Sequence, residues 1–287
     1  MSGKIAIVTD TGCSLSKEHL SRDTFVVPFY INFQDMSYKD LIDIDPETVY
    51  KKMETEIPKT SIPSPGDIKE KLEHISALGY DKILIITISS NLSSFYSSCS
   101  VVADNGIEGL EIKVIDSKNI AFGSGFLVLY AQKLIDENPD IDFENLYNRI
   151  SAFIPKSRVF FTLDTLKYLV LGGRIGKVTA GIGTMLNIKP IISCDENGIY
   201  YTVKKTRGSE KAISEIINIV KKALNGKKNY FLALIYKNDK NFLQKIESQI
   251  SSEIKNAAAY IALNFVTPSL GVHTGASLSG IGYMILD

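Results

Sequence analysis

The sequence predicts an α/β protein of two domains. Residues 1–155 are expected to form an N-terminal domain with a mostly parallel, Rossmann-like sheet and flanking helices, and residues 156–287 a C-terminal α+β domain with a mixed or antiparallel sheet. The length of 287 residues fits two domains at roughly 150 residues each. Strand and helix patterns alternate in the first half, which is typical of parallel sheets, and the second half contains a hairpin signal at Asn197-Gly198.

The N-terminal strands are predicted from short runs of β-branched residues that end in polar loops. Such runs are typical of strands buried on both faces of a sheet. They cover residues 4–9, 82–88 and 112–115. A helix is expected over residues 65–78, because Ser64 can cap it, Pro65 suits its first position and Gly79 can end it. Further helices are expected from about Asn91 and over residues 125–137.

The predicted domain boundary follows an acidic stretch at residues 138–142 and a helix that runs to about Phe153. Beyond the boundary, strands are expected at residues 158–162, 189–193, 199–204, 230–236, 257–264 and 280–286. A helix is expected over residues 163–171. A longer helix, capped by Ser209 and ended by Asn225-Gly226, carries its apolar residues at helical spacing. This mixture of elements predicts the α+β arrangement of the second domain.

Composition argues against several classes of protein. The chain has 32 Lys and Arg against 32 Asp and Glu, and this balance argues against a nucleic-acid partner, which normally requires a basic face. The longest apolar stretch has about 12 residues, whereas a membrane span needs about 20, so none is expected. The first apolar run meets Asp10 at once and predicts a strand and not a signal peptide. We therefore expect a cytoplasmic protein.

The usual signatures of catalysis and cofactor binding fail on spacing. The segment from Gly172 to Lys177 lacks the first glycine and the final Ser or Thr of a phosphate loop, and Gly123-Ser124-Gly125 lacks the third glycine of a dinucleotide fingerprint. There is no G-x-S-x-G elbow. The three cysteines are far apart and have no nearby histidine, which favours structural thiols over a disulfide or a zinc site. The sequence therefore predicts no catalytic residue, no cofactor and no metal.

Hydroxyl side chains are abundant at two places where a ligand could bind. A serine-rich segment over residues 89–98 follows a predicted strand, and the start of a helix there would favour an anion. Ser90 or Asn91 is expected to cap that helix, which leaves Ser93 as the candidate ligand contact. Thr60 and Ser61 lie in a loop stiffened by prolines. Since Ser64 is the expected N-cap of the next helix, both hydroxyls are free to face a ligand.

Two further residues stand among glycines. Arg174 has the fork geometry that suits a carboxylate or a phosphate, and the alternative is a solvated arginine in a turn between helices. His273 lies in GVHTG, where a ligand can approach, and the alternative is a histidine with all its hydrogen bonds satisfied at a strand end. The residues alone leave these alternatives open.

Seven segments in order, VTDTG, KTSIPSP, SSNLSSFYSS, VIDSKN, YLVLGGRIGK, LNIKPI and VHTG, resemble the DegV family over nearly the whole chain. The resemblance implies a two-domain α/β protein that binds one long-chain fatty acid, of the palmitate, stearate or oleate type, in a buried tunnel. It also implies a separate ATP-dependent kinase, to which the bound carboxylate is presented for acyl phosphate formation. Such a protein is the non-catalytic, lipid-binding subunit of a fatty acid kinase in phospholipid metabolism, with at most transient membrane contact.

The resemblance also assigns roles to residues. The carboxylate contacts fall on Thr60 and Ser93, with Ser61 beside them and His273 near the same end. Arg174 and Arg207 become candidates for docking the kinase or steering phosphate.

The chain departs from the usual pattern at Ser94 and Phe95, where the family has Gly and Thr, and at Ala276 and Ser277, where it has Pro and Gly. The first departure is expected to alter the pocket or its acyl preference. Two other functions remain open: a stand-alone small-molecule phosphotransferase related to dihydroxyacetone kinases, and a regulatory protein that senses lipid without a kinase.

Overall fold

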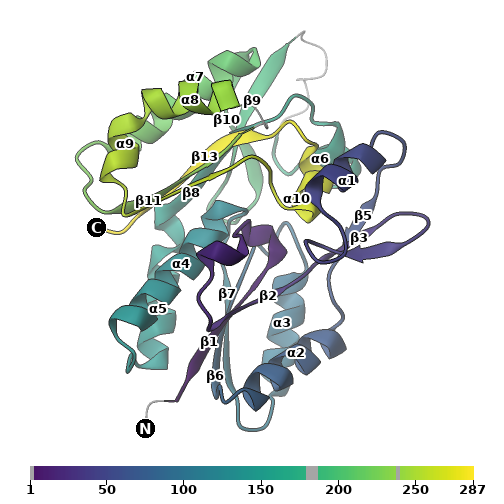
Figure 1. Cartoon of the computed structure of the whole chain (residues 1–287), viewed down its shortest axis with the longest axis vertical. Coiled ribbons are helices and arrows are strands. Elements are labelled where there is room, and N and C mark those ends of the chain that lie inside the picture. Colours follow the sequence, from purple (N-terminus) through teal and green to yellow (C-terminus); the bar gives the residue numbers. More distant parts are fainter. Residues whose placement is uncertain (1–2, 179–186, 237–239) are drawn as a thin grey trace.

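Two large sheets and one small sheet form the protein, as the computed structural model of residues 3–178, 187–236 and 240–287 shows (Figure 1). The first large sheet has four strands in the order β2-β1-β6-β7, and all are parallel. The second has six strands in the order β10-β9-β8-β13-β11-β12. This confirms the predicted α/β class, with a parallel N-terminal sheet and a mixed C-terminal sheet.

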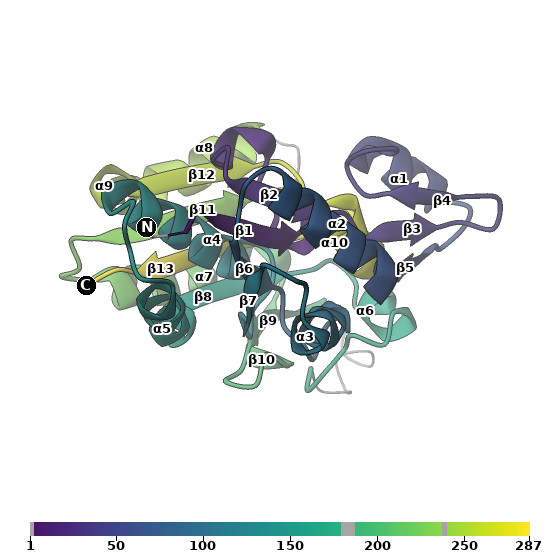
Figure 2. The same cartoon turned by 90° about the horizontal axis from the view of Figure 1, so that it is seen from below.

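The parallel sheet is covered by helices on both faces. Its strands are β1 (Ile5–Asp10), β2 (Thr24–Val27), β6 (Lys82–Thr87) and β7 (Glu111–Asp116). On one side lie α2 (Pro65–Ala77) and α3 (Phe95–Asn105), and on the other α4 (Phe122–Glu137) and α5 (Phe143–Phe153) (Figures 1 and 2). Every residue of β1 is buried, so its sequence shows no alternation of apolar and polar residues.

Helix starts were predicted with mixed success. Ser64 caps α2 as expected, and its hydroxyl and the carboxylate of Asp67 form a capping box. The helix expected from Asn91 begins at Phe95, so neither Ser90 nor Asn91 is its cap, because residues 89–94 form a turn held by other contacts. The helix expected from Gly125 begins earlier, at Phe122. The helix expected over residues 163–171 spans only α6 (Lys167–Leu171).

The mixed sheet matches most of the expected strands. It comprises β8 (Ser157–Thr162), β9 (Ile188–Cys194), β10 (Tyr200–Arg207), β11 (Tyr230–Ile235), β12 (Ala259–Leu263) and β13 (Ser279–Ile285). Only β11 and β12 pair in parallel. The Asn197-Gly198 hairpin is confirmed, because β9 and β10 pair antiparallel and Gly198 has a φ of 77°.

Three helices pack against the outer face of the mixed sheet. They are α7 (Ser209–Leu224), α8 (Lys240–Gln249) and α9 (Ser251–Asn256). The predicted apolar face of α7 is buried there. Ser209 is the first residue of α7 and not its cap, because Gly208, with a φ of 84°, holds the cap position.

Helix α4 is the layer between the two large sheets. Its side chains reach β1 and β6 on one side and β8 and β13 on the other. Phe126 is fully buried and lies against both Phe122 and Phe231. The proposed domain division at residue 155 falls inside the short turn η3 (Ile154–Lys156), between α5 and β8. Residues on both sides of that point contribute to one continuous core.

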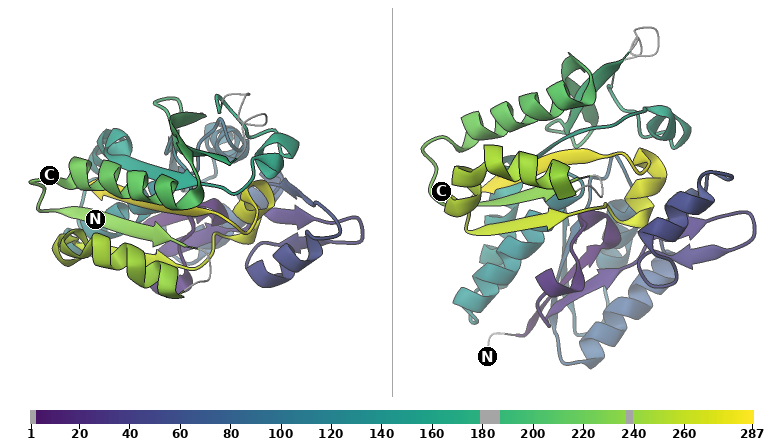
Figure 3. Two further views of the ribbon diagram at one scale, coloured as in Figure 1. Left: turned by 90° about the horizontal axis from the view of Figure 1, so that it is seen from above. Right: turned by 45° about the horizontal axis from the view of Figure 1, so that its top comes forward.

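The small sheet was not predicted. It contains β3 (Tyr30–Asn32), β4 (Ser37–Lys39) and β5 (Lys59–Ser61), and α1 (Pro46–Lys52) packs with it. Thr60 and Ser61 therefore lie in a strand, where a loop was expected. Helix α10 (Pro268–Thr274), close to the C-terminus, packs against α1 and β3, as both views in Figure 3 show. No helix in the described ranges is long and apolar enough to cross a membrane.

Candidate functional site

A cavity opens at the carboxyl edge of the parallel sheet, where that sheet meets the small sheet and the mixed sheet. It contains about 970 Å³ of empty space, counted out to its open mouth. Its walls come from both halves of the chain: the loops after β2, β6 and β7, strands β5, β8 and β13, and helix α10.

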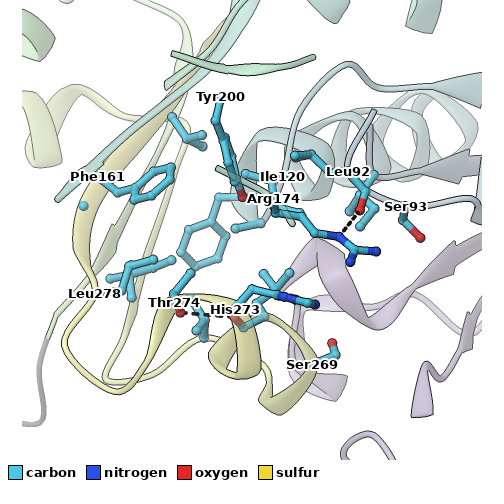
Figure 4. Close-up of a pocket in the computed structure, with 18 of the residues that line it drawn as sticks. Leu92, Ser93, Ile120, Phe161, Arg174, Tyr200, Ser269, His273, Thr274 and Leu278 are labelled. Carbon is cyan, nitrogen blue, oxygen red and sulfur yellow. Dashed lines mark hydrogen bonds between the residues drawn. The ribbon is translucent and has the colours of Figure 1, made fainter. Parts of the chain in front are cut away.

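Polar side chains gather at the mouth. Thr60, Ser61, Ser93, Arg174 and His273 all line the cavity, so the structure brings together five of the six predicted site residues. Figure 4 shows Ser93, Arg174 and His273 on one side and Phe161 and Leu278 on the other. Arg207, the sixth, is exposed at the end of β10 and does not line the cavity.

Thr60 and His273 form the central pair of the mouth. The Thr60 hydroxyl lies 2.8 Å from Nε2 of His273, across 213 positions of the sequence. His273 lies in the last turn of α10, and not at a strand end. Burial and the nearby Arg174 guanidinium lower its pKa to about 4, so the ring is neutral at pH 7. If Nε2 carries the ring proton, it donates to Thr60 and frees the hydroxyl proton for a ligand.

Ser61 points away from this pair, because successive residues of a strand face opposite sides. Its hydroxyl accepts a hydrogen bond of 3.0 Å from the Asn32 side chain. Ser93 differs, since its Oγ accepts from the backbone N–H of Phe95 at 3.3 Å. The Ser93 hydroxyl proton therefore stays available to a ligand.

Arg174 joins two walls of the mouth. Its Nε donates to the backbone oxygen of Leu92 at 3.2 Å (Figure 4). Its Nη1 donates to the backbone oxygen of Gly172 at 2.5 Å. The side chain is half-buried, so the alternative of a solvated arginine in a turn does not hold. Gly172 leaves the space that His273 occupies beside this turn. A Cβ at residue 172 would lie 2.1 Å from Nδ1 of His273.

Hydrogen bonds to the turn between β9 and β10 of the mixed sheet hold the serine-rich loop in place. The Ser89 hydroxyl donates to the backbone oxygen of Gly198 at 2.9 Å, and the Asn91 side chain donates to that of Asn197 at 2.8 Å. A Cβ on Gly198 would come within 2.1 Å of Ser89 Oγ, so this close approach requires glycine. The hairpin turn predicted from Asn197-Gly198 thus also fixes the loop that carries Ser93.

A model of the DegV family, whose members are described as uncharacterised, matches residues 4–286 of the chain. The chain belongs to the DegV family. A DegV domain-containing protein of Clostridium acetobutylicum is 34% identical over 281 residues, which cover 97% of this chain and 98% of the relative. The family predicted from the sequence motifs is therefore confirmed.

Two solved structures share the fold. A DegV family protein from Thermus thermophilus, described as fatty-acid-binding, superposes with a TM-score of 0.88 at 26% identity and covers 99% of this chain and 100% of that one. A stearic-acid-binding protein from Eubacterium ventriosum gives a TM-score of 0.84 at 28% identity and covers 98% of each chain. Both match the whole arrangement of sheets around the cavity.

The residues that depart from the usual DegV pattern differ in whether they line the cavity. Ser94 lines it. Phe95 is fully buried, and its ring meets Phe29, a lining residue, edge-on at 5.4 Å. Ala276 is exposed and does not line the cavity, and Ser277 accepts a hydrogen bond from the backbone N–H of Asp164. A changed acyl preference at Ser94 and Phe95 therefore stays a prediction.

The apolar wall of this DegV cavity was missed from sequence. Its main side chains are Phe122, Val159, Phe161, Tyr200, Ile235, Val266, Leu270 and Leu278. Each lies within or beside a buried element, where an apolar residue is also what an ordinary core requires. No sequence signal distinguishes the two uses.

The low pKa of His273 predicts a pH dependence of stability. The folded pKa of about 4 lies below the ordinary 6.5, so the unfolded chain binds more protons between these values. The stability is present above pH 6.5 and is lost as the pH falls towards 4, by about 3 kcal/mol at 1.36 kcal/mol per pH unit. Urea unfolding of the wild type and of His273→Gln, compared at each pH, measures this change.

The comparison of the two proteins is needed because buried Asp10 acts in the opposite direction. Burial raises its pKa to about 7, so its contribution to stability falls as the pH rises from about 4 to 7. Asp10 is common to both proteins and cancels in the difference. A difference in unfolding free energy that stays constant from pH 4 to pH 7 would contradict the buried, neutral imidazole.

Proposed function

We propose that this protein binds one long-chain fatty acid, with its acyl chain in the cavity and its carboxylate at the mouth. The observation that carries this is the division of one cavity into an apolar interior and a mouth of hydroxyls, an imidazole and a guanidinium. Two solved structures described as binding fatty acids, at 26% and 28% identity, support the substrate class. Palmitate, stearate and oleate are the expected types.

Burial of the acyl chain supplies most of the affinity. About 14 methylenes at about 0.8 kcal/mol each give a gross gain on the order of 11 kcal/mol. Ordering of the chain and desolvation of the carboxylate lower this figure. Each charge-assisted hydrogen bond at the mouth adds roughly 1.5–3 kcal/mol and decides which end of the ligand faces out.

The proposed carboxylate contacts are Thr60 and Ser93. His273 stands behind Thr60 as its hydrogen-bond partner, and Ser61 lies at the rim. The positive end of the α3 dipole lies beside Ser93 and Ser94 and favours the same negative charge. A neutral His273 supplies no positive charge to the carboxylate. Among the five predicted site residues that line the cavity, only Arg174 is then charged.

We place the chemistry on a separate ATP-dependent kinase. There, a carboxylate oxygen would attack the γ-phosphorus of ATP, giving acyl phosphate and ADP. This chain would present the carboxylate and catalyse nothing itself, in keeping with a sequence that lacks a phosphate loop. Arg174 at the mouth and exposed Arg207 are proposed to dock the kinase or steer phosphate. Three buried free thiols fit a reducing cytoplasm.

Denaturing mass spectrometry of the purified chain tests the binding proposal. A carboxylic lipid is expected to copurify, and palmitate at a hundred times its Kd is expected to raise the unfolding free energy of delipidated protein by about 2.7 kcal/mol. No copurifying lipid, together with no thermal shift from palmitate or oleate, would refute it. ATP turnover by the isolated chain would instead favour a stand-alone phosphotransferase. Lipid binding without a kinase in a pull-down would favour a lipid sensor.

A further inference from the structure

Along β13, the face that meets α4 first carries glycines, which have no side chain, and then a large side chain. Gly280, Gly282 and Met284 alternate on the face that meets α4, and Gly280 and Gly282 line the cavity. Gly282 lies between Ala233 of β11 and Val159 of β8. One pair further along, Met284 and Phe231 stand opposite each other and cover the sheet. The sheet therefore leaves room for a ligand only as far as Gly282.

Two rings of α4 close the space above that glycine. Phe122 and Phe126, one helical turn apart, stack at 5.9 Å with an angle of 20° between their planes. A Cβ on Gly282 would lie 3.3 Å from Cε2 of Phe126, so this ring rests directly on the bare strand. Phe126 is held in turn by Phe231, with ring centroids 6.1 Å apart. Phe122 belongs to the cavity wall.

This end of the cavity is its closed end. Phe122 is 1% exposed and Phe126 fully buried, whereas Ser61 and Ser94 at the other end are exposed to solvent. We infer that Phe122 and Phe126, seated on Gly282, form an aromatic stop that sets the longest acyl chain the protein accepts. The inference rests on the proposed fatty-acid function and adds the position of the terminal methyl group, against Phe122.

Packing makes the aromatic stop a sharp limit. The Phe126 ring has neighbours on α4, β11 and β13, so it cannot rotate away without opening voids in the core. A methylene that cannot enter the cavity stays in water and forfeits about fourfold in affinity, from about 0.8 kcal/mol of burial. Chains longer than the cavity should therefore gain no further affinity, and they bind more weakly where the extra length displaces the carboxylate from the mouth.

Competition among saturated fatty acids tests the aromatic stop. Delipidated protein is incubated with an equimolar mixture of myristic, palmitic, stearic and arachidic acids, and the bound fraction is analysed by mass spectrometry. Phe126→Ala opens space behind Phe122 and is expected to raise the ratio of arachidic to palmitic acid by about tenfold or more. Gly282→Ala pushes the Phe126 ring towards the cavity and is expected to shift binding towards myristic acid.

Two further proteins make the result decisive. Phe122→Leu removes a ring but keeps the core filled, so it serves if Phe126→Ala does not fold. Tyr283→Phe changes the opposite face of the same strand, where Tyr283 packs on Phe160, and is expected to keep the wild-type ratios. Unchanged ratios in folded variants of the aromatic stop would overturn this inference alone. A wild type that binds none of the four acids would overturn the proposed function and this inference with it.

Discussion

Replacing Thr60 by valine and Ser93 by alanine is expected to lower the affinity for palmitate by about two to four orders of magnitude. Each change removes one proposed hydroxyl donor to the carboxylate, worth roughly 1.5–3 kcal/mol, while the cavity keeps its shape. Thr60→Val also removes the partner of His273 Nε2 and leaves that ring nitrogen without its hydrogen bond. Isothermal titration of delipidated protein with palmitate measures the loss.

Ser98→Ala provides the matched control. Ser98 lies on α3, one turn beyond Ser94, and does not line the cavity, so its loss is expected to leave palmitate affinity unchanged. Equal losses in the Ser98 variant and in the Thr60 and Ser93 double variant would show that these hydroxyls do not hold the carboxylate. The acyl cavity would then account for binding without an oriented head group.

Gly172→Ala is expected to displace His273 and weaken palmitate binding by about tenfold or more. The backbone of Gly172 is helical, with φ −78°, so alanine is allowed there and the effect is purely one of space. Its Cβ would lie 2.1 Å from Nδ1 and 2.9 Å from Cε1 of His273, and the ring must leave Thr60 to make room. Overpacking of this kind also costs about 1–3 kcal/mol of stability.

The neighbouring glycine separates this clash from a general effect on the turn. Gly173 has a φ of 70° and nothing within 4 Å of its Cβ position, so Gly173→Ala strains the backbone without touching His273. It is expected to lower stability and keep palmitate affinity. In a His273→Ala background, Gly172→Ala should lose most of its effect. Additive losses in that double variant would contradict the steric mechanism.

The fold was predictable where local pattern and tertiary environment agree. The runs in β1 and β6 are apolar because helices cover both faces of their sheet, and Gly198 supplies the left-handed residue that the turn between β9 and β10 needs. The small sheet was missed, because its strands have only three residues and Pro58 and Pro63 flank β5. Such strands exist through packing on α1 and α10, and neither partner is visible in the local sequence.

The polar half of the candidate site was predictable and the apolar half was not. Thr60, Ser93, Arg174 and His273 drew notice because hydroxyl, guanidinium and imidazole groups in glycine- or serine-rich segments are chemically conspicuous. The sequence does not distinguish Phe122 and Phe161 from ordinary core residues, because the same residues would be equally suitable in a core without a cavity. The geometry that joins Thr60 to His273 depends on a helix and a strand 213 positions apart.

Helix α4 ties the two halves of the chain into one cooperative unit. Both large sheets pack against the buried side chains of α4. Unfolding of either sheet would therefore expose apolar side chains that also pack against the other sheet. The cavity lies along the same seam, so the proposed fatty acid would contact both halves at once. Its binding would then stabilise the whole fold and not one half alone.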